Sequence, residues 1–257
     1  MKLGELSWND VPDHTGRVVV LPLGSTEQHG RHLPLRTDTL MVEHIAERVE
    51  RELPEMLFLP ALWVGMSEHH RGFPGTVSLP AALYTGVVEQ MAECLIQAGF
   101  RRIFLLNGHG GNTLPGQQAL FNVQLRHPER PDLWLAMAGW WDLAAASMAA
   151  LEGFEQSDVI HACEIETSMV QAVRPDLVGA DRHGAVIDFP SAYYAPDHRR
   201  PSSVYVPRDF RQLSRTGAFG LPQAASPAKG QSVLDVVVRD VVAFLREFSG
   251  WPAFSPG

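Results

Sequence analysis

The chain has 257 residues, 45% hydrophobic and 19% charged, which is enough for one sizeable core and excludes an intrinsically disordered protein. The formal net charge of −8, with eleven histidines counted as neutral, disfavours a nucleic-acid backbone or an anionic membrane as partner. Two cysteines, Cys94 and Cys163, exclude a disulfide framework, and no apolar run approaches a leader segment or a membrane span, so we expect a cytoplasmic protein.

Short apolar runs alternate with segments of helical period along the first half of the chain. The run RVVVLPLG at residues 17–24 is typical of a strand buried on both faces. Further strand candidates follow at residues 57–65, 102–108 and 133–139. Helical periods separate them at residues 39–52, 83–99 and 112–127, and Gly99 supplies a helix stop. This alternation predicts an α/β fold with a mostly parallel sheet covered on both faces.

The second half of the chain has two further helix candidates around an irregular stretch. Residues 161–177 and 230–248 are the helix candidates, and the second has an apolar stripe on one side. Residues 175–228 are rich in Pro, Gly, Ser and Arg and have little periodicity, which is more often functional or interfacial than disordered. We find neither repeats nor a linker, so we predict a single domain over residues 1–257.

Ionisable side chains follow two of the predicted strands. Glu27, His29 and Asp38 come after the first strand, and His109 comes directly after the third. The carboxyl ends of parallel strands meet at one edge of a sheet, where ligands bind in open α/β folds. We therefore expect these four side chains to converge on one site.

The residue types of this site indicate a metal centre. Two carboxylates and two imidazoles without a thiolate pair suit Zn²⁺, Mn²⁺ or Fe²⁺, and a carboxylate can bridge two such ions. On the predicted helix 161–177, Glu166 shares the face of Met169 and Val173, whereas Glu164 lies on the polar side. An inward-facing carboxylate needs a partner or a metal, so Glu166 is the better fifth ligand.

Each of these residues also has a structural explanation. Glu27 could cap backbone amides, Asp38 could favour a helix start through the dipole, and His109 could tolerate an unusual backbone angle. The GHGGN loop could cradle a phosphate, but it lacks the Lys of a P-loop and the spacing of a dinucleotide fingerprint.

Four motifs stand in order along the chain: LPLGSTEQHGRHLPLRTDT, FPGTVSL, NGHGGN and HACEIETS. In order and spacing they resemble the creatininase (creatinine amidohydrolase) family over most of residues 1–175, and the C-terminal helix fits that family too. The resemblance implies a three-layer α/β/α sandwich with a binuclear metal centre that hydrolyses a C–N amide bond, often one in a small ring.

Carried over position by position, the resemblance implies a set of metal ligands. Glu27 and His109 would bind one ion, His29 would bind the other, and Asp38 would bridge the two. A hydroxide between the ions would be the nucleophile. Zinc is the first candidate for both ions, with manganese or iron as alternatives.

The resemblance also implies catalytic and substrate-binding residues. His161 matches the family histidine that carries a proton to the leaving nitrogen, and Glu164, on the same predicted helix, is placed to orient it. His70, Trp140 and Trp141 match positions that shape the substrate pocket. The alternatives are a backbone hydrogen bond for His161, a solvated loop position for His70 and core positions for the tryptophans.

One position departs from the creatinine-hydrolysing members of the family. They carry a metal-binding Glu two residues after the histidine of NGH, and this chain has Gly111 there. In members with NGHGGN the glutamate of ETS is the natural replacement, which is Glu166 here. The departure argues against creatinine as the substrate. Members with NGHGGN include formamide-cleaving enzymes of deazaflavin biosynthesis and the peptidase that trims the mycofactocin precursor.

We therefore expect a metal-dependent amidohydrolase that acts on a cyclic amide or a formamide. A metallopeptidase that trims a peptide C-terminus is the first alternative, with 175–228 building a wider cleft, and a non-catalytic metal-binding protein is the second. A serine hydrolase is disfavoured because the chain has no G-x-S-x-G elbow. The resemblance also implies a homo-oligomer, often a hexamer, for which the aromatic segment 189–206 could provide contacts.

Overall fold

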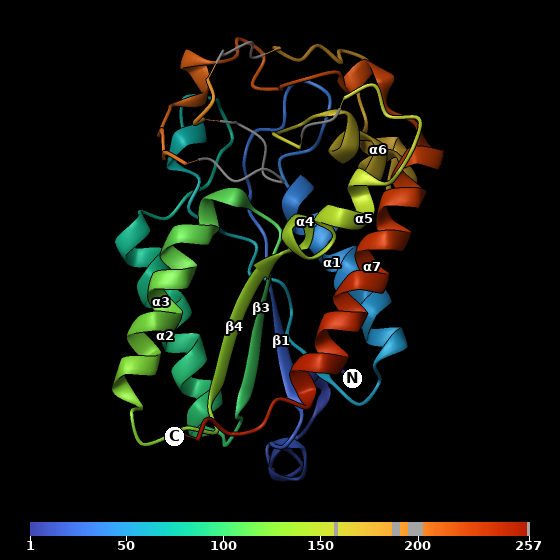
Figure 1. Ribbon diagram of the computed structural model, residues 1–257. Coiled ribbons are helices and arrows are strands. Elements are labelled where there is room, and N and C mark those ends of the chain that lie inside the picture. Colours follow the sequence, from blue (N-terminus) through green and yellow to red (C-terminus); the bar gives the residue numbers. More distant parts are fainter. Residues whose placement is uncertain (157–158, 187–190, 195–202, 256–257) are drawn as a thin grey trace.

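Four parallel strands form the central sheet of the protein. The computed structural model describes residues 1–156, 159–186, 191–194 and 203–255, and its strands lie in the order β2-β1-β3-β4 (Figure 1). The strands are β1 (Val18–Leu23), β2 (Leu57–Phe58), β3 (Arg102–Asn107) and β4 (Trp134–Gly139). Leu23 pairs with Asn107 and Asn107 pairs with Gly139, so three strands end at the same edge.

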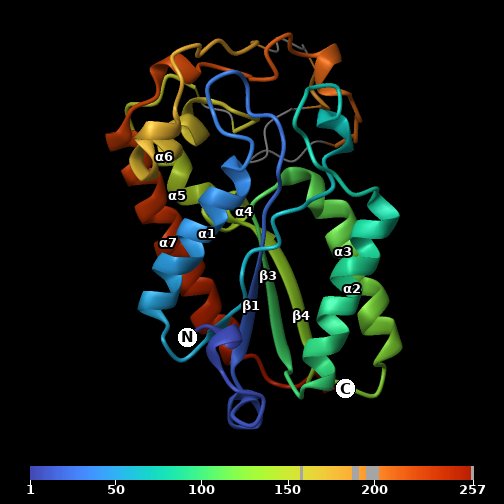
Figure 2. The ribbon, with the colours of Figure 1, turned by 180° about the vertical axis from the view of Figure 1, so that it is seen from behind.

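Helices cover both faces of this sheet. In Figures 1 and 2, α2 (Ala81–Gln97) and α3 (Thr113–Arg126) lie on one face, and α1 (Thr37–Glu52) and α7 (Pro227–Ser249) lie on the other. The predicted three-layer α/β/α sandwich with a parallel sheet is therefore confirmed. Within the described residues, no helix combines the length and the apolar character needed to cross a bilayer.

Short helices complete the description. The remaining α-helices are α4 (Trp140–Leu143), α5 (Ala145–Ala149) and α6 (Glu164–Val173). Single turns of 3₁₀-helix lie at Leu3–Glu5, Val11–His14, Glu68–His70, Gly110–Asn112, Pro175–Leu177, Phe210–Gln212 and Pro222–Ala224. The helices α4 and α5 were not predicted, because each is too short to show a period.

Two predicted elements are shorter than expected. The strand predicted at 57–65 ends at Phe58, because Pro60 has no N–H to continue the ladder, and isolated bridges from Leu62 to Leu23 and from Gly65 to Ser78 follow. The helix predicted at 161–177 begins at Glu164 in α6. Ala162 precedes it with φ of 47°, in the left-handed region that interrupts a helix.

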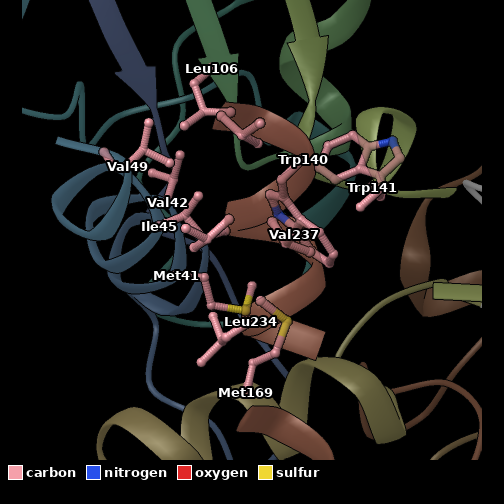
Figure 3. Packing of buried hydrophobic residues seen from close by; sticks show 14 of the residues in the cluster. Met41, Val42, Ile45, Val49, Leu106, Trp140, Trp141, Met169, Leu234 and Val237 are labelled. Carbon is pink, nitrogen blue, oxygen red and sulfur yellow. The ribbon is translucent and has the colours of Figure 1, made fainter. Parts of the chain in front are cut away.

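The apolar core lies in two layers, one on each side of the sheet. On the side of α1, Met41 and Ile45 pack with Met169 of α6 and with Leu234 and Val237 of α7 (Figure 3). On the opposite side, a second cluster joins the sheet to α2 and α3 through buried side chains that include Tyr84, Val88, Ala92, Ala119, Leu120 and Val123. Both layers leave the carboxyl edge of the sheet free for polar residues.

The α6–α7 contact depends on a glycine. A Cβ at Gly230 of α7 would overlap the carbonyl oxygen of Ser168 in α6, so the two backbones touch at this point. Ser226, the N-cap of α7, accepts a hydrogen bond from the Lys229 N–H at 3.3 Å and donates its own N–H to the Ser168 Oγ at 3.1 Å. The start of α7 is thereby fixed against α6.

We predict opposite effects for two helical glycines. Gly230→Ala should lower the free energy of unfolding by about 1–3 kcal/mol, because the new methyl group forces α6 and α7 apart. Gly86 of α2 has nothing within 4 Å of its Cβ position, so Gly86→Ala should raise that free energy by up to about 1 kcal/mol. Urea denaturation measures both, and equal stability of the two variants would contradict the tight helix contact.

Candidate metal centre

The predicted ligands converge at the carboxyl edge of the sheet. Glu27 and His29 lie in the loop between β1 and α1, Asp38 is the second residue of α1, and His109 follows β3. Glu166 lies in the first turn of α6. All five side chains are buried, so the sheet edge carries a polar centre with little exposed surface.

Close backbone packing places Asp38 beside the β3 loop. A Cβ at Gly108 would press against the Val42 side chain at 2.8 Å and the Asp38 carbonyl oxygen at 3.1 Å. The β3 loop therefore runs directly over the first turn of α1. A carboxylate in that turn is also favoured by the helix dipole, so the fold supplies part of the energy needed to bury Asp38.

The five side chains form two overlapping donor groups. Glu27, Asp38 and His109 form one, and His29, Asp38 and Glu166 form the other; within each, one ligand atom per residue lies within 4.8 Å of the others. Asp38 Oδ1 lies 2.9 Å from His29 Nε2, and Asp38 Oδ2 lies 3.0 Å from His109 Nδ1. Two cations that share one bridging carboxylate would fit this arrangement.

Backbone carbonyls select the ligating nitrogen of each imidazole. His29 Nδ1 lies 3.2 Å from the Glu27 carbonyl oxygen, and His109 Nε2 lies 3.1 Å from the Met66 carbonyl oxygen. A carbonyl oxygen only accepts, so in the neutral rings these nitrogens carry the protons. The lone pairs then lie on His29 Nε2 and His109 Nδ1, which both face Asp38, as in metal-ligating histidines.

Two carboxylate oxygens at the centre lack hydrogen bonds. Glu27 Oε1 and Asp38 Oδ2 are buried without a hydrogen-bond partner among the residues that the structure describes. Imidazole nitrogens nevertheless lie 3.2 and 3.0 Å from them. Buried carboxylates are unfavourable unless they are paired or bind a cation. The donor set therefore fits divalent cations that prefer nitrogen and oxygen ligands.

The crowding of acids and imidazoles shifts their pKa values. Burial acts to lower the pKa of His29, but the charge and hydrogen bond of Asp38 outweigh it and raise that pKa to about 9. Burial raises the pKa of Glu166 to about 7. Burial also opposes ionisation of Asp38, but His29 and His109 hold its pKa well below the usual range. Bound cations would take the place of the protons that His29 and Glu166 hold.

His161 adjoins both donor groups and, with Glu27 and His29, forms a further group whose ligand atoms lie within 4.8 Å of one another. Its Nε2 donates to the Gln28 carbonyl oxygen at 2.7 Å, its Nδ1 lies 3.8 Å from Glu27 Oε1, and its ring centroid lies 4.2 Å from that of His29. Burial and the neighbouring His29 hold the pKa of His161 well below its ordinary value, so the ring is neutral. The backbone hydrogen bond expected as the alternative is present, but it leaves Nδ1 facing the centre.

Glu164 is engaged elsewhere. Its carboxylate accepts from Lys229 Nζ at 2.5 Å and from the backbone N–H groups of Glu155 and Gln156 at 3.0 and 2.7 Å. Across the described ranges, no hydrogen bond or ion pair joins it to His161. These contacts favour a structural role, which anchors the segment before His161 to α7. The prediction that Glu164 orients His161 gains no support from them.

Cys163 lies between His161 and Glu164 in the sequence and is fully buried. Burial raises the pKa of its thiol to about 12. A thiol held in its neutral form is a poor nucleophile, so Cys163 acts as a small apolar side chain of the core.

A cavity of about 650 Å³ opens from the donor groups. Its wall includes the aromatic and basic side chains of His69, His70, Trp141, Tyr205, Arg208 and Phe210. Of the two predicted pocket tryptophans, only Trp141 reaches it. Trp140 is buried in the apolar core near Val237 (Figure 3), since neighbouring residues of α4 point in different directions. We therefore assign Trp140 no substrate contact.

His70 is a buried part of the centre rather than a solvated loop residue. It is 1% exposed, and its Nε2 lies 3.2 Å from Glu27 Oε1. Burial and the neighbouring His161 hold its pKa well below the ordinary value. The His70 ring thus lines the cavity and also contacts the Glu27 carboxylate.

Sequence reasoning missed two residues of this region. Gln28 is buried between Glu27 and His29 in the chain and contacts both His70 and His161. The sequence signal for Gln28 was its place between Glu27 and His29. Side chains alternate in an extended loop, however, so this pattern would point the Gln28 side chain away from the site. Phe210 packs its ring 4.2 Å from His70 and 5.1 Å from His161. Phe210 is half-buried and comes from the irregular segment, where no periodicity marks such a residue.

The structure also explains the departure at Gly111. A Cβ there would overlap the Met66 carbonyl oxygen and His109 Nε2, and would lie 2.8 Å from His69 Cε1. No side chain fits at position 111 without a backbone shift, so a glutamate ligand is excluded from this position as the chain is folded. Of the aromatic segment 189–206, residues 189–190 and 195–202 lie outside the described residues.

Known proteins resemble this chain along nearly its whole length. It matches the creatininase family, described as creatinine amidohydrolase, over residues 4–245. Creatinine amidohydrolase of Pseudomonas putida is 30% identical over 259 residues, which cover 95% of this chain and 96% of that protein. The mycofactocin precursor peptide peptidase of Mycobacterium tuberculosis (strain CDC 1551 / Oshkosh) is 33% identical over 260 residues, which cover 97% and 91%.

Solved structures resemble the fold as well. A crystal structure of creatinine amidohydrolase (creatininase) has a TM-score of 0.77 at 31% identity and covers 96% of this chain and 97% of its own. A mutant creatininase described as the Zn-Zn type and a creatininase described as Mn have TM-scores of 0.76 and 0.78 at 30% and 29% identity, with the same coverage. With the family match, the whole-length relatives and the two donor groups in agreement, this chain belongs to the creatininase family.

Proposed function

We propose that this protein is a metal-dependent amidohydrolase that cleaves the C–N bond of a cyclic amide or a formamide. The observation that carries the proposal is the pair of buried donor groups that share Asp38 and open onto the cavity. Membership of the creatininase family makes the chain a hydrolase of amide-type C–N bonds. The substrate, the number of ions and the roles of single residues are the parts that we propose.

The proposed cofactor is two divalent ions per chain, with zinc the first candidate and manganese or iron as alternatives. Glu27 and His109 would hold one ion, His29 and Glu166 the other, and Asp38 both. When bound, such ions supply Lewis acidity, which lowers the pKa of water towards 7 and polarises an amide carbonyl. The creatininase structures described as Zn-Zn and Mn support divalent metals of this kind.

The proposed proton carrier is His161. Its Nε2–H is held by the Gln28 carbonyl oxygen, so the lone pair lies on Nδ1, next to Glu27. A neutral imidazole with a free Nδ1 can take a proton from attacking water and give it to the leaving nitrogen. The Gln28 carbonyl keeps the ring in this orientation while the proton moves.

The cavity wall supports a small, planar amide as the substrate. Trp141 and Phe210 offer flat apolar surface beside His69 and His70, which offer polar ring atoms. The absence of room at Gly111 argues against a site built like that of the creatinine-hydrolysing members. We therefore propose a cyclic amide or a formamide other than creatinine.

A peptidase that trims a peptide C-terminus is the second candidate. The cavity extends from the donor groups to Tyr205 and Arg208 on the exposed segment, which leaves space for more than one residue. The peptidase relative of Mycobacterium tuberculosis is as similar in sequence as the amidohydrolase relatives. Arg208 would offer a positive charge to a terminal carboxylate.

We also propose a cytoplasmic homo-oligomer, with a hexamer as the state implied by the resemblance. Leu114, Phe121 and Leu125 of α3 are 57%, 61% and 63% exposed and lie on one side of the helix. An exposed apolar stripe of this kind supports contact between copies.

Removal of the shared carboxylate should abolish metal binding. Elemental analysis of the purified wild-type protein should give about two transition-metal ions per chain, and Asp38→Asn should lose most of both because its carboxylate serves both groups. Asp235→Asn is the matched control, since Asp235 is exposed and pairs with Arg48 and Gln231, away from the donor groups. A wild-type protein that stays metal-free with added zinc, manganese and iron would contradict the proposal.

Loss of His161 should separate chemistry from metal binding. His161→Asn should lower kcat by about 10²- to 10⁴-fold on whichever substrate is cleaved in a panel of lactams, formamides, creatinine and C-terminal peptides, while the metal content stays unchanged. His183→Asn, at an exposed site, is the control. Full activity of His161→Asn would rule out the proton-carrier role, and a loss of metal would identify His161 as a ligand instead.

A further inference from the structure

Gln28 occupies the centre of the hydrogen-bond network behind the proposed metal centre. Its side chain is 4% exposed. Its Nε2 lies 2.9 Å from His70 Nδ1, 3.0 Å from His161 Nε2 and 3.2 Å from the Gly217 carbonyl oxygen. The amide nitrogen carries two hydrogens and has three polar neighbours, so the acceptor of each hydrogen has to be assigned.

Backbone groups fix which way the amide points. The Gly30 N–H can only donate, and it lies 3.0 Å from Gln28 Oε1. The Gly217 carbonyl can only accept, and it lies next to Gln28 Nε2. Each end of the amide is therefore assigned by a backbone group that can only donate or only accept. In the flipped orientation, the amide NH₂ would face the Gly30 N–H and the amide oxygen would face the Gly217 carbonyl oxygen.

One of the three neighbours of the amide nitrogen cannot accept a hydrogen bond from it. His161 Nε2 lies 2.7 Å from the Gln28 carbonyl oxygen, which only accepts, so Nε2 carries a proton and cannot accept another hydrogen bond. The two hydrogens must then go to the Gly217 carbonyl oxygen and to His70 Nδ1. His70 Nδ1 is thus an acceptor without a proton.

In a neutral ring, the proton of His70 must then lie on Nε2. That atom lies 3.2 Å from Glu27 Oε1, the buried oxygen that has no hydrogen bond of good geometry within the described part of the chain. The other oxygen, Oε2, accepts from Ser25 Oγ at 2.9 Å. The His70 Nε2–H therefore lies beside Oε1, while Ser25 Oγ donates to Oε2, which His109 Nε2 also approaches at 3.1 Å.

We propose that Gln28 is a positioning residue, which holds His70 in the Nε2–H tautomer and through it orients the Glu27 carboxylate for metal binding. The tautomer follows from hydrogen bonding alone, whereas the consequence for metal binding rests on the proposed function. Outer hydrogen bonds of this kind typically change metal affinity or activity about 10- to 100-fold.

The Gln28 side chain occupies space that a glycine at position 217 leaves open. Gly217 has φ of 85°, and a Cβ there would overlap Gln28 Oε1. Ser214 Oγ accepts from the Gly217 N–H at 3.1 Å and donates to the Ala218 carbonyl oxygen at 2.8 Å. The loop that carries the Gly217 carbonyl is therefore itself hydrogen-bonded in place.

The test compares three variants by two measurements. The first measurement is the ¹⁵N chemical shift of the His70 ring nitrogens in metal-free, histidine-labelled protein, with the signals assigned by their loss in His70→Gln. The second is zinc affinity, measured by competition with a chelating dye. The variants are Gln28→Glu, Gln28→Met and the control Gln171→Met, which removes another buried amide from α6.

In the wild-type protein, His70 Nδ1 should be unprotonated and Nε2 protonated. In Gln28→Glu, an acceptor replaces the donor, so Nδ1 should become protonated. In Gln28→Met, the His70 signals should show a mixture of tautomers, and zinc affinity should fall about 10- to 100-fold relative to Gln171→Met.

A His70 Nδ1 that is protonated in the wild-type protein, or unprotonated in both Gln28 variants, would overturn the proposal. Equal zinc affinity of Gln28→Met and Gln171→Met would overturn its second half. A wild-type protein that binds none of zinc, manganese and iron would contradict the proposed function, while the tautomer measurement in metal-free protein would still decide the assignment for Gln28.

Discussion

The structure depends on one buried carboxylate held between two imidazoles. Asp38 lies 2.9 Å from His29 and 3.0 Å from His109 at the point where α1 begins and the β3 loop crosses it. An acid in this position is unfavourable unless positive charge surrounds it. The helix dipole, the two imidazoles and any bound cation all supply that charge. The loops after β1 and β3 are therefore tied to each other through Asp38 as well as through the sheet.

The polar centre and the apolar core occupy separate parts of the molecule. The two hydrophobic layers pack along the faces of the sheet, whereas the ionisable side chains gather at its carboxyl edge. This separation lets the edge carry buried groups such as Glu27 Oε1, which has no hydrogen bond among the described residues, because the stability of the fold comes from apolar area elsewhere. Trp140 and Trp141, adjacent in sequence, both belong to the layer beside α1 and α7, but only Trp141 also reaches the cavity.

Strand ends and helix faces could be predicted from the sequence, but contacts between loops could not. Glu27 and His109 were assigned to one edge because parallel strands end together, and Glu166 was chosen because a helix face is periodic. Both arguments use regular structure. Gln28 and Phe210 were missed because their neighbours come from loops far apart in the chain, and loops have no period. The short β2 was missed because the apolar run past Pro60 meets β1 only through an isolated bridge at Leu62, which an apolar pattern cannot distinguish from a continuous ladder.

The two donor groups differ in what holds them. Glu27 and His109 come from loops that leave paired strands, so the sheet itself sets their separation. Glu166 depends on α6, whose first turn follows the left-handed Ala162; the Ala162 N–H donates to Glu166 Oε2 at 2.5 Å. The position of α6 in turn depends on its backbone contact with Gly230 of α7. Glu166 is thus the one ligand of the five that depends on a helix–helix contact, whereas Glu27, His29 and His109 come from the loops after β1 and β3, and Asp38 is common to both groups.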